Sequence, residues 1–349
     1  MRQDTAHQQK ILNIFQSTFS SVLLSSGFNT LLQEVKSALF SRDFEKAFGK
    51  EDYLEAYAAR WSPTRALCYA AVLDGIRSHL EQLCGRQPQQ DEDGEGGDER
   101  ARAVLRVLAI GGAAAELASV ASHLSRQPPE TAGSISLLDV ASWAGVVDKL
   151  QTGLTTPPKL SKYASAAAQA ANTAFVTPSR LQDVDFKQHD VLALSREDLS
   201  ILISPDSSSS SSSSSSQSKP VLVTLLFTLN ELFTAAGIGK TTTFLLTLTS
   251  VLPAGSLLLV VDSPGSYSET TVGKEAKRYP MQWLLDRVLL GAEQDGEEEE
   301  EAAGWEKIEA KDSVWFRLAP ELRYPIALED MRYQMHLYRR VIGNGKIDG

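Results

Sequence analysis

The amino-acid sequence predicts an α/β fold with a mostly parallel sheet and antiparallel strands at its end, preceded by a helical region. First, the apolar run 104–110, broken only by Arg106, stops at Gly111-Gly112 and passes into small helix formers, a strand–turn–helix pattern. Second, apolar runs alternate with helical patterns between residues 134 and 290. Third, two strand-like segments, 313–318 and 331–338, lie close together near the end of the chain, which is typical of antiparallel neighbours.

Residues 1–84 form the predicted N-terminal helical region. Apolar residues recur at helical spacing throughout it, and a break falls at Ser62-Pro63. Because no catalytic cluster is visible here, we interpret the region as a helical cap that packs on the next domain. The alternative is a role in docking the substrate, for which Arg60, Trp61 and Arg65 are the candidates.

Composition shifts divide the rest of the chain. Residues 85–100 are rich in Gly, Gln and acids and are predicted to be an acidic linker, and residues 101–349 form the predicted main domain with low-complexity insertions at 207–219 and 292–303. Residues 91–99 and 293–301 hold thirteen acids and no base, and without them the formal charge changes from −10 to +3. A mildly basic folded body permits an RNA partner.

The second strand is predicted at 134–139 and ends in Asp139, which lies 28 residues after Gly111. In doubly wound folds, an acid at this point binds ribose hydroxyl groups. The alternative is a helix N-cap, because apolar residues at helical spacing follow from Trp143 onward. A third strand is expected at 174–176.

The second half of the chain continues the alternation. A central strand is predicted at 220–229 and ends at Asn230-Glu231, followed by a helix over 244–252, a buried strand over 256–262 and a helix over 281–290. Residues 331–338 alternate strictly between the two faces of a strand, which predicts a half-buried strand.

Two segments resemble motifs that are typical of other functions. Gly239-Lys240-Thr241 matches the end of a phosphate-binding P-loop, but Thr234 occupies the position of the required first glycine. Residues 241–261 lack any charge over a length that could span a membrane, but Pro253-Ala254-Gly255 divides them into a helix and a strand. We therefore expect neither a P-loop nor a membrane segment.

The expected ligand site lies at the carboxyl ends of the parallel strands, beside the glycine turn at Gly111-Gly112. The chain shows no Ser–His–Asp order, no metal-ligand spacing and no nucleophile elbow, and its five histidines are isolated. Cys68 and Cys84 fit a reducing compartment, and the N-terminus lacks the apolar segment of a secretory signal. Without hydrolytic or metal groups, the pattern favours group transfer from a bound cofactor.

Five segments together resemble those of a known family. They are Arg60-Trp61-Ser62-Pro63-Thr64-Arg65-Ala66, Gly111-Gly112-Ala113-Ala114-Ala115-Glu116, Phe227-Thr228-Leu229-Asn230-Glu231-Leu232-Phe233, Leu259-Val260-Val261-Asp262-Ser263-Pro264-Gly265-Ser266-Tyr267 with Lys277-Arg278-Tyr279-Pro280-Met281-Gln282-Trp283, and Leu328-Glu329-Asp330-Met331-Arg332-Tyr333-Gln334. The pattern is similar to that of the fungal 25S ribosomal RNA uridine-N3 methyltransferases and spans most of the chain outside the low-complexity segments.

The resemblance implies a seven-stranded, Rossmann-like class I methyltransferase fold with S-adenosylmethionine as the methyl donor. It implies that large-subunit rRNA or a pre-ribosome is the substrate, and that the protein works in the nucleus, nucleolus or cytoplasm during ribosome biogenesis. We expect no metal, no membrane association and a monomer. The residues expected to contact the donor are Gly111, Gly112, Ala113, Glu116, Asp139, Asp183 and Val184.

One position departs from the pattern of such methyltransferases. Many carry an acid two residues before the first glycine of the turn, where it contacts the amino group of the donor, but this chain has Ala109 there. Glu116 or a loop residue must then meet the methionine end of the donor.

The chemistry of N3 methylation selects the remaining candidates. The N3 proton of uridine must be removed or shared, and N3 must lie in line with the methyl group. We expect Asn230 to orient the uracil edge and Glu231 to assist with the proton, although Glu231 could instead cap a helix. The expected substrate contacts are Phe233, Tyr267, Arg278 and Arg332.

Two other functions stay open at this point. A non-catalytic methyltransferase-like protein could serve in ribosome assembly or as a scaffold, and Ala109 and Ala113 favour it slightly. An NAD(P) oxidoreductase would be expected to have a third glycine near Glu116, which the chain lacks.

Overall fold

The computed structural model describes residues 4–85, 103–181, 183–204, 219–265, 267–272, 275–291 and 304–342. Apart from Gly85 and Lys219, the predicted acidic linker and the two predicted insertions lie outside these residues. The domain limits given above stay predictions.

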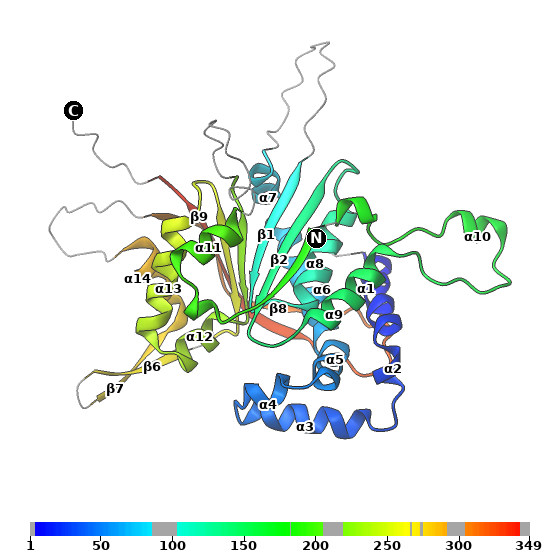
Figure 1. Ribbon diagram of the computed structural model, residues 1–349, viewed down its shortest axis with the longest axis horizontal. Coiled ribbons are helices and arrows are strands. Elements are labelled where there is room, and N and C mark those ends of the chain that lie inside the picture. Colours follow the sequence, from blue (N-terminus) through cyan, green and yellow to red (C-terminus); the bar gives the residue numbers. More distant parts are fainter. Residues whose placement is uncertain are drawn as a thin grey trace, which may run out of the picture. The chain divides into compact units, whose positions relative to one another are not determined.

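A seven-stranded sheet is the central element of the fold, as the sequence predicted (Figure 1). Its order is β3-β2-β1-β4-β5-β9-β8. The ladders of β2 with β3, β1 with β4 and β4 with β5 are parallel, and β9 joins β5 antiparallel. The strands, in chain order, are β1 (Val104–Ile110), β2 (Ala132–Asp139), β3 (Asp183–Gln188), β4 (Leu222–Leu226), β5 (Leu257–Asp262), β8 (Trp305–Phe316) and β9 (Met331–Arg340).

The order of the strands places a topological switch between β1 and β4. The chain runs from β1 to β2 and β3 on one side and resumes on the other side with β4 and β5. In open α/β sheets, ligands bind outside the carboxyl ends of the strands at such a switch. The glycine turn at Gly111 follows β1 directly, so it lies at this position.

The chain divides into two compact units. The first comprises residues 1–105, 112–188 and 316–331, and the second comprises residues 106–111, 189–315 and 332–349.

The first unit carries the predicted N-terminal helices together with β2 and β3. Helix α6 packs along α8, as Figure 1 shows, and both helices are buried over most of their length. The prediction of a helical region before the first strand is confirmed. Its helices are α1 (Thr5–Thr18), α2 (Ser20–Leu23), α3 (Phe28–Phe40), α4 (Phe44–Phe48), α5 (Glu51–Arg60), α6 (Ser62–Gly75), α7 (Arg77–Leu83), α8 (Ala114–Ser125), α9 (Ala144–Thr155) and α10 (Ala166–Ala170), with the short 3-10 turn η1 (Pro178–Arg180).

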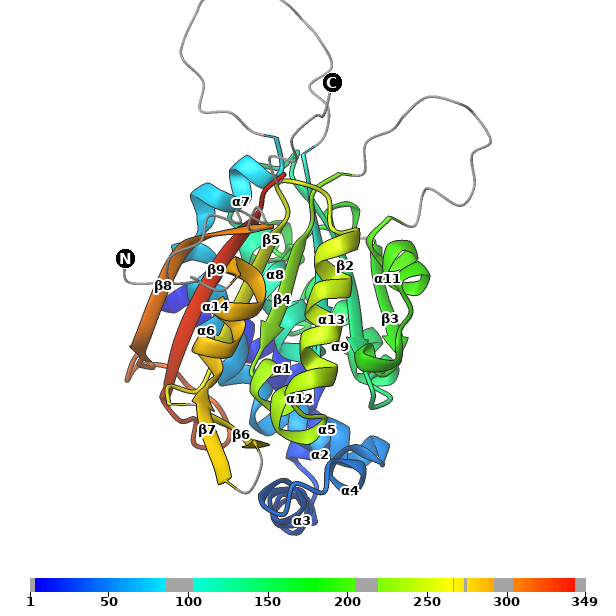
Figure 2. The same ribbon diagram turned by 90° about the vertical axis from the view of Figure 1, so that its left-hand side faces the viewer.

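The second unit is built on β4 and β5, whose residues are all buried. Its helices are α11 (Arg196–Ile203), α12 (Leu229–Ala235), α13 (Ile238–Val251) and α14 (Met281–Leu290), with the 3-10 turn η2 (Val191–Ala193). The strands β6 (Tyr267–Val272) and β7 (Glu275–Pro280) form a separate antiparallel pair. In Figure 2, β8 lies at one edge of the main sheet beside β9.

The segments that resemble a P-loop and a membrane span both belong to ordinary secondary structure of this unit. Gly239-Lys240-Thr241 lies in the first turn of α13, and the preceding element is helix α12 instead of the strand that a P-loop requires. The uncharged stretch 241–261 divides into α13 and β5. Among the described residues, no helix is both long and apolar enough to cross a membrane.

The expected third strand at 174–176 is wrong. This segment is a loop in which the Val176 N–H donates to the carbonyl of Leu154, and the third strand is β3, formed by residues 183–188. Strand β3 lies at the edge of the sheet and most of it is exposed, so its sequence is polar and lacks the apolar run of a buried strand.

The expectation that the last strand is half-buried is also wrong. Residues 333–338 of β9 are buried on both faces, including the polar side chains of Gln334 and His336. A hydrogen bond between Gln334 and His336 offsets part of the cost of burying them, although Nδ1 of His336 has no partner, and the Tyr338 hydroxyl donates to Asp286 of α14 at 2.6 Å. The strict alternation of polar and apolar residues predicted that one face of β9 is in contact with solvent. In the structure, the polar residues on that face are buried instead.

We expect Gly111→Ala to destabilise the protein by about 2 to 4 kcal/mol, because the new Cβ meets two obstacles. Gly111 has φ +68°, and a Cβ there would lie 2.4 Å from Oγ1 of Thr228. Gly239→Ala is the matched control, since a Cβ in this first turn of α13 has no neighbour within 4 Å. Urea unfolding of both variants measures the difference, and equal free energies of unfolding would contradict the close contact at Gly111.

Candidate functional site

The turn after β1 brings the chain close to the start of α12. Gly111 adopts a left-handed backbone, and Thr228 fills the space that a Gly111 side chain would need. From the sequence we expect this glycine to allow the close approach of a ligand. The structure adds a second reason, because the missing side chain also makes room for Thr228.

The carboxyl end of β4 is strained. Phe227 has φ +58°, a conformation that is rare for a large aromatic residue, and its N–H donates to the carbonyl of Val261 at 2.6 Å. Thr228 then serves as the N-cap of α12. Non-glycine residues in the left-handed region concentrate at functional sites, where the surrounding structure holds them in place.

Asn230 and Glu231 lie in the first turn of α12, so the prediction of a strand through residue 229 is corrected: β4 ends at Leu226. The backbone N–H of Asn230 donates to Oδ2 of Asp262 at 3.0 Å, which ties this turn to the end of β5. The side-chain atoms Asn230 Oδ1 and Glu231 Oε2 are buried and have no hydrogen-bond partner. Buried acceptors without a partner are costly, so this pair fits a site that receives a ligand's donor groups.

Polar residues at the ends of β5 and β9 support this turn. The Asp262 side chain is almost fully buried and accepts the Ser263 N–H at 2.8 Å, while Gln334 Nε2 donates to the Ser263 carbonyl at 2.8 Å. Gln334 Oε1 lies 3.1 Å from Nε2 of His336, and burial lowers the pKa of His336 to about 4. Sequence reasoning missed the supporting role of Gln334 and His336, although their place in a strand between apolar residues was a usable signal.

The predicted substrate contacts have different surroundings. Phe233 is only 1% exposed and packs in the core, so its expected contact with the base is not supported. The backbones of Tyr267 and Arg278 belong to β6 and β7, and their side chains lie outside the described residues. Arg332 is exposed, donates to Ser313 Oγ at 2.9 Å and lies over the ring of Trp315, which is itself 52% exposed.

In the first unit, Glu116 caps the helix that follows the glycine turn. Its Oε2 accepts the N–H of Ala113, the N-cap of α8, at 2.8 Å. Gly112 and Ala113 are buried beside it. Burial raises the pKa of Glu116 to about 7, against the lowering effect of its backbone hydrogen bonds and of Arg65.

Asp139 ends β2 with a carboxylate held by the loop that follows. Its Oδ1 accepts the Ala141 N–H at 2.8 Å, and the Trp143 side chain also donates to it. Burial raises the pKa of Asp139 to about 6. Trp143, and not Asp139, is the N-cap of α9, so the alternative of a helix cap at Asp139 is not what the structure has.

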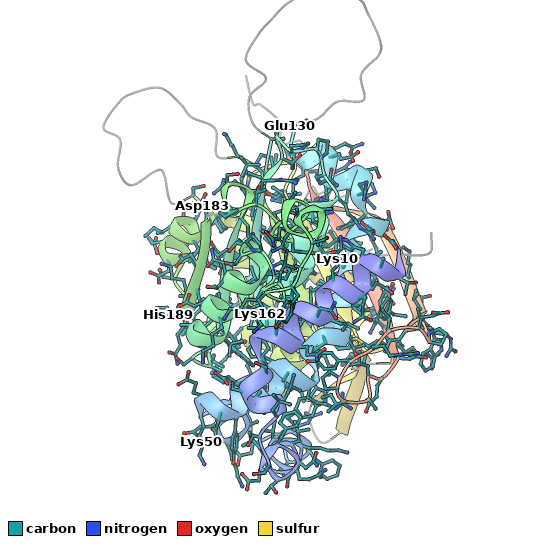
Figure 3. All side chains as sticks on the ribbon, turned by 90° about the vertical axis from the view of Figure 1, so that its right-hand side faces the viewer. Lys10, Lys50, Glu130, Lys162, Asp183 and His189 are labelled. Atoms are coloured by element: carbon teal, nitrogen blue, oxygen red, sulfur yellow. The ribbon has the colours of Figure 1, made fainter. Side chains whose placement is uncertain are left out.

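Asp183 and Val184 lie at the opposite end of β3 from the edge where a ligand was expected. Asp183 is opposite Ser134 at the start of β2, whereas Gln188 is opposite Asp139. Figure 3 shows Asp183 and His189 at the two ends of this strand. The error follows from the misplaced third strand, which made Asp183 the residue after a strand instead of the first residue in one.

Sequence reasoning also missed a cluster of polar side chains from α5 and α6. Arg65, expected at an exposed end, is partly buried, and its Nη1 donates to the hydroxyl of Tyr57. Tyr57 packs against the rings of Trp61 and Trp143. Burial lowers the pKa of Arg65. The neighbouring Tyr57, Tyr69 and Glu116 raise this pKa by more, so that it lies above its usual value. The segment Arg60–Ala66 was the available signal, since it already stood out by resemblance.

The described residues contain no group of three or more His, Cys, Asp or Glu side chains arranged to hold a metal ion. The two sets of polar residues instead suit organic groups. The set in the second unit offers acceptors to a ligand's N–H, and the set in the first unit offers carboxylates and a guanidinium.

Known proteins with similar sequences indicate the class of protein to which this chain is related. Residues 15–339 match the model of a family described as "Putative SAM-dependent methyltransferase", where SAM is S-adenosylmethionine. A curated relative from Saccharomyces cerevisiae, named 25S rRNA (uridine(2843)-N(3))-methyltransferase, is 29% identical over 350 residues that cover 96% of this chain and 86% of the relative.

Two solved structures are also similar to this chain. An O-methyltransferase family protein from Burkholderia thailandensis matches with a TM-score of 0.36 and 13% identity over 91% of this chain and 71% of that chain. A SAM-dependent methyltransferase from Methanosarcina mazei matches with a TM-score of 0.33 and 9% identity over 68% of this chain and 92% of that chain. Because both TM-scores are low, the fold class rests on the strand order described above.

We expect Glu116 to make the free energy of unfolding fall as the pH rises from about 4.5 to about 7. The folded protein keeps a proton on Glu116 up to about pH 7, whereas the unfolded chain loses it near 4.5. The stabilisation is therefore complete below pH 4.5 and lost through pH 7, an effect of about 3 kcal/mol. Glu116→Gln lacks this dependence, and the contribution of Asp139 cancels because both proteins retain it. Urea unfolding at pH 4.5 and pH 8 tests this, and parallel pH profiles would contradict it.

Proposed function

Because the chain belongs to a family of SAM-dependent methyltransferases, we propose that it methylates N3 of a uridine in large-subunit ribosomal RNA. The named activity of the yeast relative, which aligns over nearly the whole chain, supports the choice of substrate. The observation that carries the proposal within the structure is the pair of buried, unpartnered acceptors, Asn230 Oδ1 and Glu231 Oε2. An uncharged uracil presents an N–H at the atom to be methylated, and such acceptors are what it needs.

The donor fits the polar residues beside the glycine turn. When bound, SAM supplies an electrophilic methyl group on its sulfonium sulfur. Asp139, at the carboxyl end of β2, suits the ribose hydroxyl groups, and Gly111, Gly112 and Ala113 form the turn next to the donor. The buried carboxylate of Glu116 suits the ammonium group of the methionine end, which Ala109 cannot bind.

The proposed roles of α12 concern the proton on N3. Glu231 accepts this proton through Oε2, which frees an electron pair of N3, while Asn230 holds the uracil edge through its side-chain amide. With SAM bound, the bond from N3 to the methyl carbon would replace the carbon–sulfur bond, and S-adenosylhomocysteine would leave. The backbone bond from Asn230 to Asp262 keeps the turn in place, so the two side chains need little reorganisation when the base arrives. The strained backbone at Phe227 serves the same end, because it directs the chain from β4 into α12.

Binding of the RNA is proposed to involve the basic and aromatic surface of the second unit. Arg332 and Trp315 form an exposed pair in which a ring face and a cation lie together, an arrangement suited to a base and its phosphate. Tyr267 and Arg278 remain proposed contacts. Phe233 is left out, because its side chain is in the core.

A ribosomal RNA substrate also sets the proposed place of action. We propose that the protein works as a monomer in the nucleus, nucleolus or cytoplasm on rRNA or on a pre-ribosome. The formal charge outside the two acidic segments, +3, is compatible with such a partner.

We expect Glu231→Gln to lower the rate of methyl transfer by about 100- to 10,000-fold, because the amide cannot take the N3 proton. The measurement is single-turnover transfer from labelled SAM to large-subunit rRNA, with 3-methyluridine identified by nucleoside mass spectrometry. Glu197→Gln is the matched control, since Glu197 also lies in the first turn of a helix of the same unit but is exposed.

An unchanged rate in Glu231→Gln would exclude its role as the base. Methylated uridine that carries the label at an atom other than N3 would overturn the proposed reaction. A wild-type protein that binds rRNA but forms no methylated nucleoside would favour the scaffold function instead.

A further inference from the structure

The methionine end of the donor has no acidic partner at the position where many methyltransferases have one. Ala109 occupies that position, is fully buried in β1 and pairs with Thr224 of β4. The α-ammonium and α-carboxylate of SAM must therefore be bound by other residues. An amino-acid end needs one anionic and one cationic group, placed apart from each other.

Glu116 is the first of these groups. It is 7% exposed, it follows the glycine turn directly, and its hydrogen bonds come from backbone N–H groups. The charge of Arg65 only partly offsets the burial of this carboxylate, which still raises the pKa of Glu116 to about 7. An ammonium ligand would offset more of the cost of burial.

Arg65 is the second group. It comes from α6, which packs along α8, the helix that carries Glu116. The Tyr57 hydroxyl orients its guanidinium, and the charges of Arg65 and Glu116 influence each other. A guanidinium has a fork of N–H donors that matches a carboxylate.

Thr64, next to Arg65 in α6, gives an independent indication of a ligand. It lies in the first turn of α6, is 5% exposed, and its Oγ1 is buried without a hydrogen-bond partner. The N-cap of α6 is Trp61, which provides no side-chain cap. The first turn of this helix therefore joins uncapped N–H groups, a buried hydroxyl and a guanidinium, all of which favour an anion.

We propose that Arg65 and Thr64 bind the α-carboxylate of SAM while Glu116 binds its α-ammonium. The inference rests on SAM as the donor of the proposed function and names the residues that hold its amino-acid end. It also changes the interpretation of the N-terminal helices, since α6 supplies half of a ligand subsite instead of a cap alone. The groups concerned all belong to the first unit.

The test compares two ligands that differ in the amino-acid end. S-Adenosylhomocysteine carries this end and 5′-methylthioadenosine lacks it, so the ratio of their dissociation constants isolates the subsite. We expect Arg65→Gln to weaken S-adenosylhomocysteine by about 10- to 100-fold in calorimetric titration of the full chain and to leave 5′-methylthioadenosine unchanged. Thr64→Val should lower the same ratio by a smaller factor, and Arg65→Lys should retain part of it.

Arg126→Gln is the matched control. Arg126 lies at the other end of α8 and forms an ion pair with Asp74. Like Arg65→Gln, this variant removes the charge of a partly buried arginine, but it does so away from the glycine turn. Its ligand ratio should equal that of the wild type. Thermal unfolding of each variant shows that it is folded at the titration temperature.

Three results would overturn the proposal. The ratio could stay unchanged in Arg65→Gln and Thr64→Val, or both ligands could weaken equally, which would mean a structural role. The wild type could also bind the two ligands equally, in which case no amino-acid subsite exists. A protein that does not methylate rRNA would be a separate result, because the binding of S-adenosylhomocysteine and 5′-methylthioadenosine would still be as expected.

Discussion

The close contact between Gly111 and Thr228 is the constraint on which the second unit's site depends. No side chain fits at Gly111, so the end of β1 and the start of α12 approach each other at backbone distance. The position of Asn230 and Glu231 follows from that approach, and the bond from Asn230 to Asp262 adds the end of β5 to the same assembly. Three neighbouring parallel strands thus end in one fixed arrangement, which a reaction between two separately bound molecules requires.

The elements that the sequence predicted correctly are those whose burial determines their composition. Strands β4 and β5 are buried throughout, β1 is buried from Val107 to Ile110, and all three read as apolar runs; α14 was located to its ends. Edge strand β3 escaped notice because solvent on its faces permits Asp183, Asp185 and Lys187. Strand β9 was assigned the wrong surroundings because its polar residues Gln334 and His336 are buried and share a hydrogen bond, although Nδ1 of His336 has no partner.

The candidate site was predictable only in part, for a similar reason. Glu116 and Asp139 follow strands or the glycine turn, so sequence position alone indicates them. Arg65 could not be found in this way, because its proximity to Glu116 arises from the packing of α6 on α8 between segments some fifty residues apart. The error at Asp183 shows the converse, since a shift of a few residues in one strand moved a residue to the wrong edge of the sheet.

The outer position of β8 has a consequence for the behaviour of the protein in a crowded solution. An edge strand offers unpaired backbone groups to any extended chain that approaches it, which is a route to aggregation. Strand β8 carries Lys307, Glu309 and Lys311 along its length, and its middle is largely exposed. A second chain adding to this edge would have to accommodate these charges, so the strand that completes the sheet also discourages the sheet from growing further.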